Sequence, residues 1–174
     1  MRVTPVACVL MALTLALSSS CASATPGEPG TATVVQTVDG DTIDVDVAGT
    51  RERVRLIGID TPETKHPTEP VECFGPEASD HLSGLLPPGT EIRLERDVEA
   101  RDRYDRLLAY VYRAEDGLFV NLSQAEGGFA DTLTFPPNVA HTEQIVAAVS
   151  AARAGGAGLW SACGGPDVAA DGAR

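Results

Sequence analysis

The chain has few cysteines, few histidines and few cations, and each scarcity argues against a class of protein. Its 174 residues include 4 cysteines and 3 histidines, with no cluster at the spacing of zinc or copper ligands. Lysine and arginine number 13 against 25 aspartate and glutamate residues, a net charge of −12, which argues against tight or processive nucleic-acid binding. No apolar run reaches the about 20 residues that a membrane-spanning helix needs.

A secretion signal is predicted over residues 1–24. Arg2 precedes an apolar run and a stretch of small residues, the pattern of a segment removed on export. Two processing routes remain open. Residues 22–24, Ala-Ser-Ala, match a cleavage site and would release a secreted protein. The sequence ending at Cys21 resembles a lipoprotein signal, which would anchor the protein at the outer face of the membrane; its leucine lies one position too far from Cys21, so secretion is slightly favoured.

The remainder of the chain divides into a linker, one domain and a tail. Residues 25–32 are rich in proline and glycine and are predicted to be a flexible linker. Residues 33–163 are long enough for a single domain with its own core, and residues 164–174 are expected to be a disordered tail. No repeat is visible, no protein partner is implied, and a monomer is expected.

The apolar pattern predicts five short strands and about three helices. The strands are expected at residues 34–38, 43–47, 54–59, 90–95 and 107–113. Helices are expected to begin near Gly75, Leu118 and Thr142, and Thr142 is expected to cap the last one. The inner face of that helix carries Ile145, Val149 and Ala152. A helix after the third strand is the order of an OB-fold, a five-stranded Greek-key barrel, here with helices in the α+β class.

The stretch from residue 54 to residue 67 concentrates the candidate chemistry. Its apolar strand cannot continue past Thr61, because Pro62 has no N–H to donate. Asp60 and Glu63 therefore lie where a rigid strand becomes a loop, and Arg55 lies earlier on the same strand. Carboxylates and an arginine at a strand end suit a metal ion and a phosphate ester better than a fold core.

Asp41 is a second candidate, placed by strand alternation. Ile43, Val45 and Val47 share one face of their strand, and Asp41 has the same parity. A carboxylate on that row is costly unless it is paired or binds a metal ion. Asp41 could instead only line the edge of a turn at residues 39–40. The presence of Asp60 favours the metal interpretation.

Cys73 and Cys163 remain once the signal and Cys21 are set aside. In an exported protein, two such cysteines most simply form a disulfide with each other. A metal site is disfavoured, because neither has a cysteine or histidine at ligand spacing. A closed loop of this length could contribute about 4–5 kcal/mol in the chain-entropy model, as an upper estimate.

Residues 54–67 resemble the active-site segment of the staphylococcal nuclease family. Residues 39–42, Asp-Gly-Asp-Thr, and residues 102–110, Asp-Arg-Tyr-Asp-Arg-Leu-Leu-Ala-Tyr, match in the same order, as does the ending at residues 158–161. The resemblance implies the same OB-fold. It also implies a Ca²⁺ cofactor, with three ligand residues: Asp41, Asp60 and, through its backbone carbonyl, Thr61.

The same resemblance implies catalytic and substrate-binding roles. Arg55 and Arg106 match the phosphate-binding arginines, and Glu63 matches the glutamate usually assigned as general base; whether Glu63 takes the proton or orders the water stays open. Arg103 and Tyr104 match positions that contact the terminal phosphate of a nucleotide. The segment 132–137 lacks the tyrosines that often stack on bases in the family. Its one aromatic residue, a phenylalanine, could stack on a base or plug the core.

The leading interpretation is an exported Ca²⁺-dependent phosphodiesterase. It would hydrolyse single-stranded or denatured DNA and RNA and leave 3′-phosphate and 5′-hydroxyl ends. The cations gather in two groups, which favours a locally positive cleft on an acidic body: Arg51, Arg53, Arg55 and Lys65; Arg101, Arg103 and Arg106. The alternative is a non-catalytic OB-fold binding module at the cell surface, which the acidic charge and the missing tyrosines favour.

Overall fold

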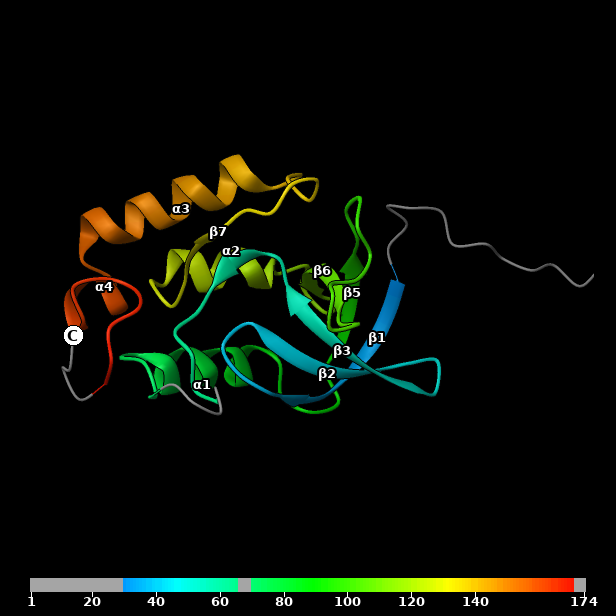
Figure 1. Ribbon diagram of the computed structural model, residues 1–174. Helices are drawn as coiled ribbons and strands as arrows, with labels where there is room; N and C mark the ends of the chain where they lie inside the picture. The colour runs from blue at the N-terminus through cyan, green and yellow to red at the C-terminus, as the bar shows by residue number, and fades with distance from the viewer. Residues whose placement is uncertain (1–29, 66–69, 171–174) are drawn as a thin grey trace, which may run out of the picture.

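The computed structural model describes residues 30–65 and 70–170 (Figure 1). The predicted signal and residues 25–29 of the predicted linker lie outside the described residues. Residues 30–32, also assigned to that linker, instead begin the first strand, where they pair with residues 92–94 of a later strand. Within the described ranges, no helix is long and apolar enough to cross a membrane.

Five strands close into a barrel, which confirms the predicted OB-fold. They are β1 Gly30–Thr37, β2 Thr42–Val47, β3 Thr50–Leu56, β5 Glu91–Glu95 and β6 Leu107–Arg113. The order around the barrel is β1-β2-β3-β6-β5, and β1 closes it by pairing with β5. The β3–β6 pair is parallel and the others are antiparallel. Alternate residues of the strands fill the interior, including Val34, Ile43, Val45, Val54, Leu56, Ile92 and Val111.

The predicted third strand is two elements rather than one. β3 ends at Leu56, and β4, Gly58–Asp60, leaves the barrel to pair with β7, Asp131–Leu133, a strand the sequence did not reveal. Gly58 makes the change of direction, with φ of 86° and so little space that a Cβ would lie 2.6 Å from Ile145 Cδ1. The split carries Asp60 out of the barrel sheet.

The three predicted helices are present, and a fourth is short. They are α1 Gly75–Leu85, α2 Val120–Glu126, α3 Thr142–Gly155 and α4 Leu159–Ala162. Figure 1 shows α1 and α3 on opposite sides of α2, with the barrel strands at one end of the molecule and α4 at the other. The inner face of α3 is buried as predicted, but Thr142 is its first residue and not its cap, a position that His141 takes without a side-chain hydrogen bond.

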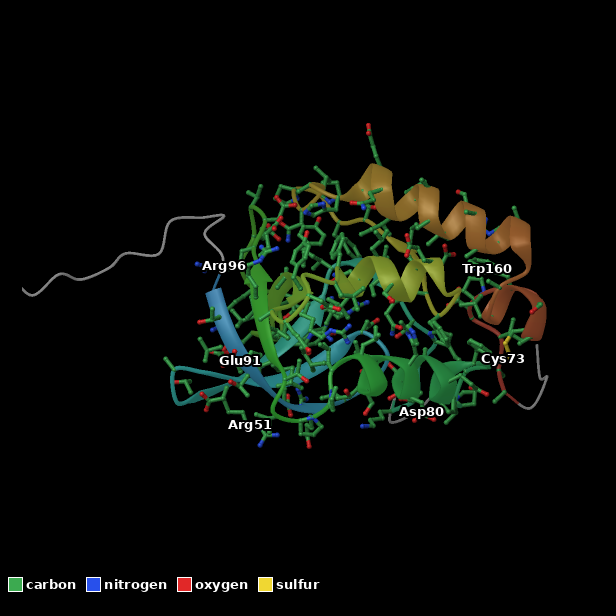
Figure 2. The ribbon with its side chains drawn as sticks, turned by 180° about the vertical axis from the view of Figure 1, so that it is seen from behind. Arg51, Cys73, Asp80, Glu91, Arg96 and Trp160 are labelled. Carbon is green, nitrogen blue, oxygen red and sulfur yellow. A yellow bond between two sulfur atoms is a disulfide. The ribbon has the colours of Figure 1, made fainter. Side chains whose placement is uncertain are left out.

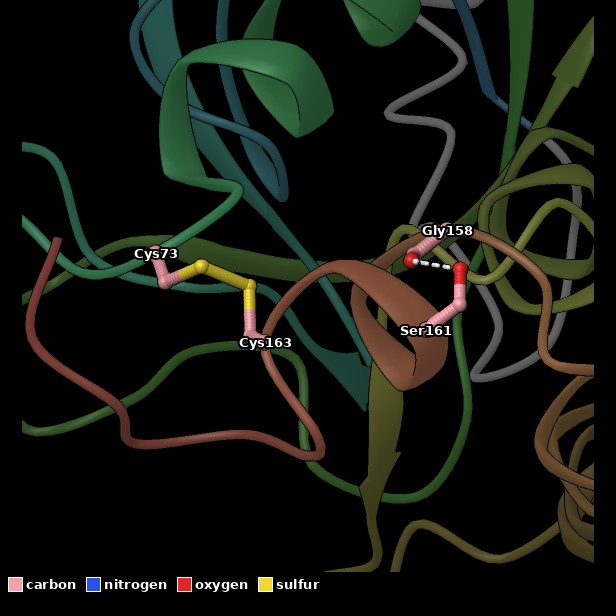
Figure 3. Close-up of a disulfide and its surroundings, with 4 residues drawn as sticks. All are labelled: Cys73, Gly158, Ser161 and Cys163. Carbon is pink, nitrogen blue, oxygen red and sulfur yellow. Dashed lines mark hydrogen bonds between the residues drawn. A yellow bond between two sulfur atoms is a disulfide. The ribbon is translucent and has the colours of Figure 1, made fainter. Parts of the chain in front are cut away.

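The C-terminal segment differs from the prediction. Residues 164–170, expected to belong to a disordered tail, are held against the segment before α1. The Cys73 N–H donates to Val168 O (2.6 Å) and the Ala170 N–H donates to Val71 O (2.9 Å). The expected Cys73–Cys163 disulfide is present, with a Cα–Cα distance of 6.0 Å across 90 residues (Figure 3). This tether keeps the segment where its backbone can pair, a constraint that local composition does not reveal.

Candidate active site

One cavity, of about 270 Å³, gathers the residues that the sequence singled out. It lies where β2, β3 and the loop after β4 meet. Its lining includes all six predicted catalytic and metal-binding residues: Asp41, Arg55, Asp60, Thr61, Glu63 and Arg106. Three further carboxylates share it: Asp39, Glu72 and Asp167. Figure 2 shows the molecule from behind, with Cys73 and Trp160 at the end opposite Arg51, Glu91 and Arg96.

Arg55 connects the two predicted metal ligands. Its Nη1 lies 2.8 Å from Asp41 Oδ2, and its Nη2 donates to Asp60 Oδ1 at 2.8 Å. Nη1 also donates to the backbone carbonyls of residues 56 and 59, one on each side of the break between β3 and β4. The side chain is only 12% exposed. The planar guanidinium therefore fixes both carboxylates relative to the end of the strand.

Asp41 also holds the residue after β4. The Thr61 N–H and hydroxyl donate to Asp41 Oδ2 at 3.1 Å and 3.2 Å. This approach requires a glycine at position 40, because a Cβ there would lie 2.7 Å from Thr61 Oγ1. Asp41 is therefore not merely a turn residue: it is buried and paired with the loop that carries the remaining candidates.

Negative charge exceeds positive charge in this cavity, because six of its carboxylates face two arginines. Burial raises the pKa of Asp60, and the charges of Asp167 and Glu72 add to that effect against the attraction of Arg55. Burial, together with the charge of Asp41, likewise raises the pKa of Asp39 to about 6. An oxygen-lined site with uncompensated negative charge fits a hard cation such as Ca²⁺. In residues 30–65 and 70–170, no three metal-binding side chains already converge on one point.

Glu63 is held by its own loop and by Glu72. Its Oε1 accepts the N–H groups of Thr64 (2.8 Å) and Lys65 (2.6 Å). Its N–H donates to Glu72 Oε2 at 2.8 Å, and the Glu72 N–H donates back to Glu63 O at 2.8 Å. Sequence reasoning missed Glu72 and Asp167. Neither has a local pattern that would reveal it, because chain folding alone brings each to the cavity.

Arg106 lines this cavity and also a neighbouring one of about 490 Å³. Asp102 orients it by accepting a hydrogen bond from Nε at 2.7 Å. Burial raises the pKa of Asp102, but the hydrogen bonds from the side chain and backbone of Arg106 outweigh it and lower that pKa. Arg55 also lines both cavities, so the two arginines lie between an acidic cavity and a less acidic one.

The neighbouring cavity contains the predicted substrate residues, Arg103 and Tyr104, and a second exposed aromatic ring, that of Phe135. Arg103 lies with its guanidinium carbon 4.7 Å from the centre of the Tyr104 ring, and its Nη2 donates to the Tyr104 hydroxyl. Tyr104 is 65% exposed and Phe135 is 69% exposed, and both line the cavity. Phe135 is therefore not a plug in the core, and its ring is available to a flat ligand.

The fold and the site together combine an OB-fold barrel with two arginines beside an acidic, oxygen-lined cavity. Residues 53–162 match the family described as staphylococcal nuclease homologue. The chain is 39% identical to the thermonuclease of Staphylococcus hyicus over 128 residues, which is 74% of each protein. It is 44% identical to the thermonuclease of Staphylococcus intermedius over 105 residues, 60% of this chain and 61% of that protein. The chain belongs to the staphylococcal nuclease family, and by this homology it is a nuclease of the thermonuclease type.

A more distant relative is also named as a nuclease. The endonuclease YncB of Bacillus subtilis is 36% identical over 134 residues, covering 76% of this chain and 62% of that protein. The family match over residues 53–162 contains five of the six predicted residues of the acidic cavity, and Asp41 lies before it.

Proposed function

We propose that the protein is an exported Ca²⁺-dependent phosphodiesterase that hydrolyses single-stranded or denatured DNA and RNA, leaving 3′-phosphate and 5′-hydroxyl ends. The observation that carries this proposal is the position of Arg55. Its guanidinium pairs with Asp41 and Asp60 in the acidic cavity and also lines the cavity beside it. A phosphate bound there would lie within reach of a cation and of two arginines.

The cation would be held by Asp41, Asp60 and the backbone carbonyl of Thr61. Hard oxygen ligands and a lining without histidine or cysteine support Ca²⁺ over zinc or copper. When bound, Ca²⁺ supplies a positive charge that neutralises and polarises the phosphate. Asp41 and Asp60 would then orient that charge, because Arg55 fixes both carboxylates before the substrate arrives.

Arg55 and Arg106 would bind the phosphate and stabilise the charge that develops in the five-coordinate transition state. An arginine fork donates two parallel hydrogen bonds to one phosphate and stays charged at any working pH. Asp102 accepts from Nε of Arg106, which lines both cavities, so the terminal nitrogens would donate to the phosphate. Glu63 would take a proton from the attacking water at a carboxylate oxygen, or hold that water in line. Arg103 and Tyr104 would contact a terminal phosphate.

Export accounts for the disulfide and the N-terminal sequence together. A structural disulfide persists in an oxidising compartment. We therefore propose that residues 1–24 are removed and the protein is secreted, or that it is anchored through a lipid on Cys21. The mass of the mature N-terminus distinguishes these routes.

Hydrolysis of denatured DNA by the mature protein, with Ca²⁺ and then with EGTA, tests the proposal. Calcium-dependent cleavage with 3′-phosphate ends is expected, and Arg106→Ala should abolish it while calcium still binds. A binding module without catalysis is the second candidate, favoured by the net charge of −12. Absence of cleavage in either condition, by folded protein with its disulfide formed, would favour that candidate instead.

A further inference from the structure

The disulfide-anchored end of the chain supports the loop that carries Glu63. Glu63 and Glu72 exchange two hydrogen bonds, one through the Glu72 carboxylate and one between backbones, both at 2.8 Å. The segment at the start of α1 also packs tightly against this loop. A Cβ on Gly75 would lie 2.7 Å from Thr64 Cγ2 and 3.1 Å from Pro62 O. Glu72 therefore bonds to both the backbone N–H and the backbone carbonyl of Glu63.

Glu72 is in turn held by the C-terminal segment. It forms an antiparallel bridge with Ala169, with backbone hydrogen bonds on both sides of it. The adjacent Cys73 is bonded to Cys163 at the end of α4 (Figure 3). α4 itself is attached to the core, because Leu159 is fully buried and its N–H donates to Gly128 O at 2.9 Å. A covalent and hydrogen-bonded path thus runs from the core through Cys163 to Glu72.

We propose that Glu72 is a positioning residue for Glu63, and that the Cys73–Cys163 disulfide holds Glu72 in its working position. The inference rests on the proposed catalytic function of Glu63. Two backbone hydrogen bonds at an exposed edge compete with water, so they hold the segment weakly without the covalent link. Loss of the disulfide therefore frees the Glu72–Cys73 segment and, with it, the backbone of Glu63. A misplacement of about 1 Å can lower a rate by about 100-fold.

Two substitutions separate this role from a direct role of the Glu72 charge at the cation. Glu72→Gln keeps an oxygen that can accept the Glu63 N–H but removes the charge, whereas Glu72→Ala removes both. We expect Glu72→Ala to lower kcat about 10-fold or more at saturating Ca²⁺, with KM nearly unchanged. Glu72→Gln should keep kcat within about threefold of wild type, because the amide oxygen can still accept the Glu63 N–H. Its calcium affinity, measured by calorimetry, should fall because the cavity loses a carboxylate, and for that reason kcat is compared at saturating Ca²⁺.

The disulfide is tested in the same assay. The double substitution Cys73→Ser with Cys163→Ser, and reduction of wild type with a phosphine, should each lower kcat about as much as Glu72→Ala. Reduction should add little to the Glu72→Ala variant, because both changes act through one contact. Ser161→Ala, which removes an exposed hydroxyl and its 3.3 Å hydrogen bond to Gly158 O at α4, is the matched control and should retain full kcat. Circular dichroism confirms that each variant is folded at the assay temperature.

The outcomes separate this inference from the function on which it rests. Wild-type kcat in the folded double cysteine variant overturns the role of the disulfide, provided that Glu63→Gln is inactive. A Glu72→Gln variant as impaired as Glu72→Ala shows that the charge is needed and overturns the positioning role. Full activity of Glu63→Gln removes the catalytic function of Glu63 itself, whatever the cysteine variants show.

Discussion

Replacing Arg55 by alanine should affect stability and catalysis together, by amounts that the structure allows us to estimate. The substitution leaves Asp41, 6% exposed, without the charge 2.8 Å away that compensates its burial. Removing one partner of a buried ion pair costs about 3–5 kcal/mol of unfolding free energy. The partly exposed pair with Asp60 adds less. We expect a loss of about 3–5 kcal/mol without calcium.

Calcium should return part of this stability, since a cation between Asp41 and Asp60 replaces the missing positive charge. Catalysis should not return, because loss of one donor to the transition state costs about 100- to 1,000-fold in kcat. Urea unfolding in EGTA and in Ca²⁺ measures the first effect, and hydrolysis of denatured DNA at saturating Ca²⁺ measures the second. Arg96→Ala, which removes the same charge from a residue that lines neither cavity, is the control.

Two results would refute this reasoning. A loss of unfolding free energy below about 1 kcal/mol in EGTA would show that Asp41 is not an uncompensated buried charge without Arg55. A kcat within tenfold of wild type would show that Arg55 is structural only. Either result removes the basis for placing the phosphate next to this guanidinium.

Three further outcomes are expected. Hydrogen bonds from Arg53 lower the pKa of Asp44 to about 2, so the contribution of this ion pair to protein stability is complete above about pH 4 and is lost as pH falls toward 2. Asp44→Asn should therefore cost about 1–2 kcal/mol of unfolding free energy at pH 7, measured by urea unfolding. An equal cost at pH 2.5 would contradict the ion pair. Gly58→Ala should destabilise by about 1–3 kcal/mol by the same measurement, because φ is 86° and its Cβ would meet Ile145, and an unchanged urea midpoint would show that the backbone relaxes freely. Phe135→Ala should raise KM for DNA by about fivefold or more and leave kcat nearly constant, whereas an unchanged KM would mean that its exposed ring does not stack on bases.

The sequence alone determined the barrel strands and the composition of most of the candidate site. Strand alternation is a local property, so the parity of Asp41 with Ile43 and Val45 could be read without any contact. The stop at Pro62 likewise placed Asp60 and Glu63 at the end of a strand. The cysteine count predicted the disulfide, because each of the two cysteines in the exported domain has only the other to pair with.

Tertiary structure alone decided which other groups reach the cavity. The break between β3 and β4 at Gly58 depends on a positive φ and on the close approach of Ile145 from α3. Ile145 lies 87 residues after Gly58 in the sequence. The contact of Glu72 with Glu63 and the arrival of Asp167 depend on how α4 and the disulfide place the C-terminal segment. Local patterns cannot encode such contacts, because the free energy that brings distant segments together comes from burial and closure of the whole barrel.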